Sequence, residues 1–124
     1  MEPINYDYGY SSKLGQFFIP RFMQENSKFK PYTNGEITLV RCVAYGDDYI
    51  VLTHYETIAV ELFYAMKANK DIRDKGILVL DEIGRIVFPK KLRTQFKFYR
   101  NTVLKSCLID ECTIRIDVVG LTID

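Results

Sequence analysis

The chain has 124 residues, the length of one compact domain or of two units too small to be stable apart. Hydrophobic residues make up 48% of it, which supports a real core, and a net charge of +1 gives no overall attraction to nucleic acid or membrane. The three cysteines lack the spacing of a disulfide framework, and no apolar run approaches the ~20 residues that cross a bilayer. We therefore expect a cytoplasmic protein with reduced thiols, on which any basic surface is local.

The first half of the chain predicts strands around one short helix. Alternating apolar residues indicate a half-buried strand, and Gly15 marks a turn before a second strand. Pro20 suits the first turn of a helix, which we expect to direct Phe22 and Met23 inward. A loop and a hairpin follow. The predicted elements are a strand over 4–10, a turn over 11–15, a strand over 16–19, a loop over 29–35, and hairpin strands over 36–44 and 49–53.

The middle of the chain changes period. Between residues 56 and 70 the apolar side chains recur at spacings of three and four, which is typical of an amphipathic helix. Thr53 and Glu56 have the spacing of a capping box at its start. The charged run 71–76 breaks the pattern and is predicted to be a connector.

The second half repeats the pattern of the first. A strand and a turn precede a further strand, Pro89 opens a helix, and a second hairpin follows. Beyond the hairpin we expect only a tail. The predicted elements are a strand over 77–80, a turn at Gly84, a strand that Pro89 ends, a helix over 90–98, hairpin strands over 102–109 and 113–119, and a tail over 120–124.

The likeness of the halves extends to an internal sequence repeat. Residues 14–20 match 83–89, and residues 40–52 align with 104–116 without a gap. Each unit has roughly forty structured residues, which is close to the size at which a core no longer sustains itself. We therefore expect the two units to pair as a pseudo-twofold barrel. The predicted division is a first repeat, a helix with connector and a second repeat: 1–54, 55–76 and 77–124.

The segment 81–93, Asp-Glu-Ile-Gly-Arg-Ile-Val-Phe-Pro-Lys-Lys-Leu-Arg, resembles the signature of SpoVT/AbrB-type swapped-hairpin DNA-binding domains. The tandem arrangement is similar to the MraZ family in particular. This resemblance implies a β-rich α+β fold of two tandem swapped-hairpin βαββ-type units with one longer amphipathic helix between them. It also implies a bacterial transcriptional regulator that acts in the cytoplasm, associated with the nucleoid. MraZ proteins assemble into rings, so we expect a homo-oligomer.

The second repeat carries the residues that would contact double-stranded DNA. Arg85, in an exposed hairpin, can reach a guanine edge in the major groove or a phosphate. Asp81 has the wrong charge for phosphate and is expected to orient Arg85 or to cap the turn. Lys90, Lys91 and Arg93 open a helix whose N-terminus favours anions, and they are predicted to make phosphate contacts.

The first repeat departs from this signature. Ser12 and Gln16 stand at the positions of Asp81 and Arg85. Gln16 can still read adenine through its amide, and Arg21 retains positive charge nearby. We expect no cofactor, no metal, no small-molecule substrate and no membrane as partners.

Other interpretations of these residues remain open. Asp81 and Arg85 could form a structural ion pair worth only ~0–1 kcal/mol if exposed. An enzyme is not expected, because the single histidine, His54, has no local signature that links it to Cys42 or Cys107 as a nucleophile. The serious alternative is a degenerate oligomeric scaffold, or an antitoxin-like interaction module, that does not bind DNA.

Overall fold

The computed structural model describes residues 6–11, 14–31, 34–68, 76–98 and 102–121. Within these ranges the chain forms short helices and a strand-rich core. The elements are β1 (Tyr6–Ser11), β2 (Gln16–Phe18), α1 (Arg21–Glu25), β3 (Glu36–Tyr45), β4 (Tyr49–Ala59), α2 (Val60–Lys67), β5 (Ile77–Leu80), β6 (Arg85–Val87), α4 (Lys90–Gln95), β7 (Thr102–Asp110) and β8 (Thr113–Leu121).

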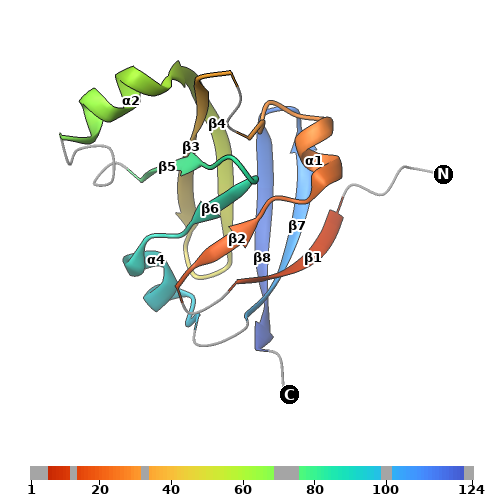
Figure 1. The fold of residues 1–124 in the computed structure, drawn as a ribbon. Coiled ribbons are helices and arrows are strands. Elements are labelled where there is room, and N and C mark those ends of the chain that lie inside the picture. Colours follow the sequence, from red (N-terminus) through yellow and green to blue (C-terminus); the bar gives the residue numbers. More distant parts are fainter. Residues whose placement is uncertain (1–5, 12–13, 32–33, 69–75, 99–101, 122–124) are drawn as a thin grey trace.

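The strands form two antiparallel sheets of unequal size. Six of them make one open sheet in the order β1-β7-β8-β4-β3-β5, so that β1 and β5 lie at its edges. The remaining two, β2 and β6, pair with each other and cross in front of the large sheet as a two-stranded ribbon (Figure 1). The predicted β-rich α+β class is confirmed.

The pairing of the strands exchanges elements between the two halves of the chain. β1, from the first half, pairs with β7 of the second, and β5, from the second half, pairs with β3 of the first. The registers correspond through the sequence repeat. Ser11 lies opposite Thr102, and Thr38 lies opposite Leu80, which are the equivalent positions. The ribbon follows the same relation, because Gln16 faces Val87 and Phe18 faces Arg85.

The main core lies between the ribbon and one face of the large sheet. Phe17 and Ile86 face each other across the ribbon and are buried against that sheet. Met23 of α1 and Leu92 of α4 are buried in the same core. The predicted inward direction of Met23 is thus confirmed. The strand residues of this core include Val40, Ile50, Leu52, Leu80, Leu104, Ile114 and Ile116. We call this side of the sheet the inner face.

A smaller core lies on the other side of the same sheet, which we call the outer face. Ile37, Leu39, Ile58 and Ile77 are buried there, and α2 lies over them with Val60, Phe63 and Met66. No residue of α2 is fully buried, so this helix covers the sheet rather than forming part of the main core.

The long helix predicted over residues 56–70 is shorter than expected. Strand β4 continues to Ala59, and the helix occupies Val60–Lys67, without a side-chain cap at its start. The predicted capping box of Thr53 and Glu56 is therefore wrong. The reason is cross-strand pairing: Glu56 and Ile58 lie opposite Leu39 and Ile37 in the sheet, and Ile58 is buried as a strand residue.

Most other element predictions are confirmed, with changed ends. The helix expected over 90–98 ends at Gln95, and Lys97 has a positive φ of 58°. The tail expected from residue 120 is wrong for 120 and 121, because β8 continues to Leu121. Position 12, the start of the first predicted strand and most of the connector 71–76 lie outside the described residues. No described helix is long and apolar enough to cross a membrane.

Candidate functional site

The ribbon presents one buried and one outward face, since alternate strand residues point to opposite sides. Its outward face consists of Gln16 and Phe18 from β2 and Arg85 and Val87 from β6. Phe18 is 54% exposed and Val87 is 47% exposed. The outward face therefore combines an amide, a guanidinium and two apolar side chains at the surface of the molecule.

The turn before β6 is fixed by the carboxylate of Asp81. One oxygen, Oδ1, accepts hydrogen bonds from the backbone N–H groups of Ile83 (3.1 Å) and Arg85 (2.8 Å), and Oδ2 accepts one from Arg85 Nε at 2.8 Å. Gly84 in this turn has φ of 82°, a conformation that other residues rarely adopt. Both functions expected of Asp81, capping the turn and holding Arg85, are present in the structure.

The guanidinium of Arg85 is held by Asp81 through its Nε atom. Its Cζ lies 5.9 Å from the centre of the Phe18 ring, and its side chain is 32% exposed. Among the described residues, its two terminal nitrogens have no partner. Because the Nε is tied to Asp81, these nitrogens are presented in a fixed direction. Such a group suits an anionic or hydrogen-bond-accepting ligand.

The predicted site residues fall into two groups at opposite ends of the ribbon. The Ile19 N–H donates to the Gly84 carbonyl at 2.9 Å, which sets the start of α1 beside the turn that holds Arg85. The equivalent bond, from the Phe88 N–H to the Gly15 carbonyl at 2.9 Å, sets α4 beside the other turn (Figure 1). Arg85 therefore lies toward Arg21 rather than toward the lysines of α4.

Lys90 and Lys91 are exposed at the start of α4. Lys90 follows Arg85 by five residues of largely extended chain, which amounts to up to about 16 Å at ~3.3 Å per residue, and Lys91 follows Lys90 in α4. The lysines thus lie near Gln16, and the structure does not join them to Arg85 in one cluster. On the other side, Arg21 has a highly exposed side chain that pairs with Glu25 at 3.7 Å.

Arg93 has a structural contact that the sequence did not indicate. Its Nε donates to the Phe88 carbonyl at 3.1 Å, and its side chain lies over Gly15, where a Cβ atom would meet Arg93 Cδ and the Phe88 carbonyl oxygen. Gln24, the equivalent residue of the first half, donates to the Ile19 carbonyl at 2.7 Å and lies over Gly84. The phosphate contact predicted for Arg93 thus competes with a contact between the halves.

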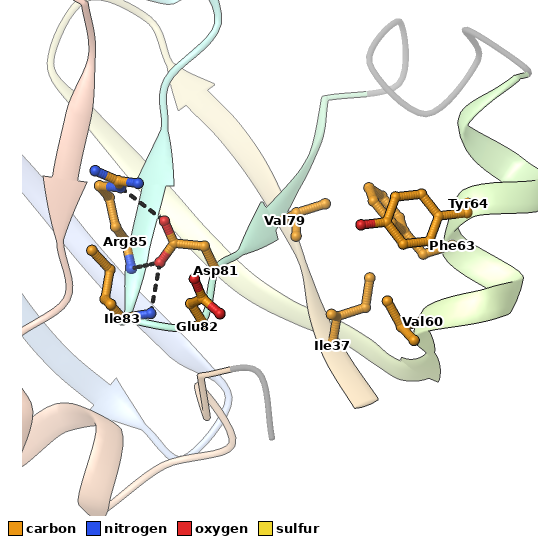
Figure 2. Close-up of a pocket in the computed structure, with 9 residues that line it drawn as sticks. All are labelled: Ile37, Val60, Phe63, Tyr64, Val79, Asp81, Glu82, Ile83 and Arg85. Carbon is orange, nitrogen blue, oxygen red and sulfur yellow. Dashed lines mark hydrogen bonds and ion pairs between the residues drawn. The ribbon is translucent and has the colours of Figure 1, made fainter. Parts of the chain in front are cut away.

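A groove adjoins the Asp81 turn and was not expected from the sequence. It has a volume of about 520 Å³ and lies between α2 and the turn. Figure 2 shows apolar and aromatic side chains, among them Phe63 and Tyr64, on its α2 side, and the guanidinium of Arg85 directed away from them. The sequence offers one sign of this groove, an isoleucine, Ile83, at a turn. In the structure, Ile83 is 53% exposed.

The other reactive side chains of the described residues, the cysteines and His54, do not form a common site. Burial raises the pKa of the Cys42 thiol to about 12, which keeps it in the un-ionised, non-nucleophilic form. Burial, followed by the charge of Lys28, lowers the pKa of His54, and its Nε2 lies 3.5 Å from the hydroxyl of Thr57. Within the part of the chain that the structure describes, no group of three or more His, Cys, Asp or Glu residues could hold a metal ion.

Comparisons of the chain with protein-family models, with curated proteins and with solved structures found no match.

Proposed function

We propose that this protein is a DNA-binding transcriptional regulator built from two tandem swapped-hairpin units, as the resemblance to MraZ-type proteins implies. The exchange of strands between the halves supports the architecture, because β1 and β5 each pair with the opposite half in the same register. In this proposal the two units close around the main core as a pseudo-twofold barrel, and the ribbon is their shared outward surface.

Arg85 is the observation that carries the functional proposal. Its guanidinium is fixed by Asp81 through Nε at 2.8 Å, while its terminal nitrogens have no partner among the described residues and its side chain is 32% exposed. A guanidinium held in this way loses little conformational entropy when it contacts a base edge or a phosphate. In this role Asp81 is a positioning residue, and Arg85 is the residue that touches double-stranded DNA.

The other proposed DNA contacts differ between the two ends of the ribbon. Arg21 lies on the Arg85 side and can add a phosphate contact there. Gln16, Lys90 and Lys91 lie at the other end of the ribbon, where the glutamine has no charge and the lysines supply phosphate contacts. One chain with so few contacts binds weakly, so we propose that several chains act together on nucleoid DNA as a homo-oligomer such as a ring.

The direct test is binding to duplex DNA from the region upstream of the protein's own operon, measured by fluorescence anisotropy at low and moderate salt. Arg85→Ala is expected to weaken binding about tenfold or more, the usual effect of losing an arginine that contacts a base edge. Arg85→Lys separates the two forms of contact, because it keeps the charge and loses the planar guanidinium. Lys67→Ala, which removes an exposed positive charge on α2, is the control.

Two results would overturn this proposal. Absence of salt-dependent binding by the wild type would reject the regulator function, and equal binding by Arg85→Ala would reject the assigned site. Light scattering on the same sample tests the oligomer, since a monomer at micromolar concentration contradicts it.

A second candidate function is an oligomeric scaffold or antitoxin-like module without DNA binding. The groove beside α2 favours it, because the exposed apolar side chains of Tyr64 and Ile83 line that groove. The same DNA experiment distinguishes the two functions.

A further inference from the structure

The outer face of the large sheet carries a row of tyrosines and charged residues away from the ribbon. Residues directly opposite each other on neighbouring strands project to the same side. Across five strands, from β1 to β3, the residues of one such row are Tyr8, Lys105, Asp117, Tyr49 and Tyr45. The neighbouring row runs through Tyr6, Cys107, Arg115, Val51 and Val43.

Three tyrosines on this face are largely exposed, whereas Tyr49 is half-buried. Tyr8 is 55% exposed, Tyr10 is 61% exposed and Tyr45 is 51% exposed. Tyr8 and Tyr10 are the repeat equivalents of Ile77 and Val79, which lie in the small core beneath α2. Among the described residues, no helix packs on Tyr8 and Tyr10. An aliphatic, covered surface in one half is thus aromatic and uncovered in the other.

Cations lie among the rings. The guanidinium of Arg115 is 3.8 Å from the centre of the Tyr49 ring, and Lys105 Nζ is 4.8 Å from that of Tyr6. Arg115 also pairs with Asp117 through two hydrogen bonds of 3.1 Å. Arg41 lies two residues before Val43 on the same side of β3, and neither it nor Lys105 forms an ion pair among the described residues. The Tyr45 and Tyr49 rings are stacked, with centres 5.1 Å apart.

We propose that this tyrosine face binds single-stranded nucleic acid. Bases stack on aromatic side chains of an open sheet, and nearby cations contact the phosphates, so rings interleaved with cations on a flat surface match both parts of a single strand. A dry protein interface fits less well, because charged residues are depleted at the centre of such interfaces, whereas Lys105, Arg115 and Asp117 lie in the middle of this face. The proposal is independent of the duplex contact at Arg85, since the ribbon packs on the inner face.

The experiment measures binding of fluorescein-labelled dT20 and rU20 to the full chain by anisotropy at low salt. The chain contains nine tyrosines and no tryptophan, so quenching of its tyrosine fluorescence is a second signal of stacking. Wild type is expected to bind saturably with quenching. Tyr8→Ala with Tyr45→Ala is expected to weaken binding about twenty-fivefold or more, because each ring removed costs about fivefold or more.

Matched variants assign the effect to this face. Tyr8→Phe with Tyr45→Phe keeps both rings and is expected to bind nearly as wild type. Tyr64→Ala, on α2 and 64% exposed, is expected to leave dT20 binding unchanged, and Arg85→Ala reports separately on any strand bound at the ribbon. Circular dichroism checks that each variant is folded. Lys105→Gln with Arg41→Gln is expected to reduce the slope of log K against log salt by about 1.4, at ~0.7 per phosphate contact.

Three results would overturn the proposal. The first is no saturable binding of either oligonucleotide by the wild type. The second is binding that Arg85→Ala removes and the tyrosine variants do not, which would place the strand on the ribbon. The third is absence of oligonucleotide binding together with a change of sedimentation in Tyr8→Ala with Tyr45→Ala, which would identify the face as a contact between copies of the chain. Loss of duplex binding alone tests the regulator function and leaves this proposal intact.

Discussion

The two halves of the chain share their backbone pairing and differ at their turns. Ile19 and Phe88 donate equivalent hydrogen bonds to Gly84 and Gly15, and Gln24 and Arg93 donate to equivalent carbonyls. Only the second half has a carboxylate and a guanidinium at its turn, where the first has Ser12 and Gln16. Since both halves form the same pairing, the fold does not require Asp81 and Arg85. That difference makes these two residues the better candidates for function.

The comparison also separates two arginines that looked alike in sequence. Arg93 has an uncharged equivalent, Gln24, which makes the same contact, so the contact requires a hydrogen-bond donor rather than a charge. Arg85 has an equivalent, Gln16, for which no such pairing with a carboxylate is found among the described residues. Equivalent positions thus show which part of a side chain the fold uses.

The largest expected effect concerns the two turn glycines, both of which have positive φ. We expect Gly15→Ala to lower the free energy of unfolding by about 3 kcal/mol and Gly84→Ala by about 2 kcal/mol. A Cβ at Gly15 would lie 2.9 Å from the backbone oxygen of Phe88, which cannot move aside, whereas at Gly84 it meets only the flexible side chain of Gln24. Urea unfolding of both variants measures the difference.

Second substitutions sharpen this test. Adding Gln24→Ala to Gly84→Ala should recover part of the loss, and adding Arg93→Ala to Gly15→Ala should recover less, because the Phe88 carbonyl remains. An equal recovery in both halves would contradict the role assigned to the backbone oxygen.

A smaller effect is expected from making the first turn like the second. Ser12→Asp with Gln16→Arg places the Asp–Arg pair in both halves. If Arg85 contacts DNA as proposed, the second arginine should tighten duplex binding about tenfold, and it should steepen the salt dependence by about one unit if it reaches a phosphate. Anisotropy titrations at several salt concentrations measure both quantities.

The control for that variant is Gln16→Lys, which adds charge without a planar guanidinium or its carboxylate partner. If this lysine tightens binding as much as the Asp–Arg pair does, general electrostatic attraction explains the result and preorganisation by Asp81 does not.

The smallest effect concerns His54, whose repeat equivalent is Val118. Burial and the charge of Lys28 lower the pKa of His54 in the folded protein. The unfolded chain therefore binds the proton more readily, and stability should fall as pH drops through the ordinary histidine value of about 6.5. His54→Val should flatten the dependence of the unfolding midpoint on pH between 7.5 and 6. An unchanged slope would show that His54 does not contribute to it.

Local sequence patterns predicted the short elements well. Pro20 and Pro89 predicted the starts of the two short helices, and the internal repeat predicted the strands β2 and β6. The junction of β4 and α2 was not predictable in this way, because the apolar spacing from Ile58 to Met66 is helical throughout. The strand continues to Ala59 because β3 lies beside it, and periodicity within one segment carries no information about that neighbour.

The site was predictable only where it is local. The contact of Asp81 with Arg85 spans four residues and follows from turn chemistry. The division of the basic residues between two ends of the ribbon depends on bonds between residues more than sixty positions apart, such as Ile19 with Gly84. Sequence therefore grouped Arg85 with Lys90 and Lys91, whereas the exchanged strands place it toward Arg21.

The strand pairing is symmetric, but only one of the two equivalent turns carries an arginine, so the two ends of the ribbon differ. A twofold dimer of identical units would present two such turns and would suit a palindromic target, since the symmetry of a site mirrors that of the protein bound to it. In this chain, the two unlike halves pair with each other, and Arg85 marks one end of the ribbon only. Each chain therefore has polarity, and a duplex contacted through Arg85 would be bound in one orientation at a non-palindromic site.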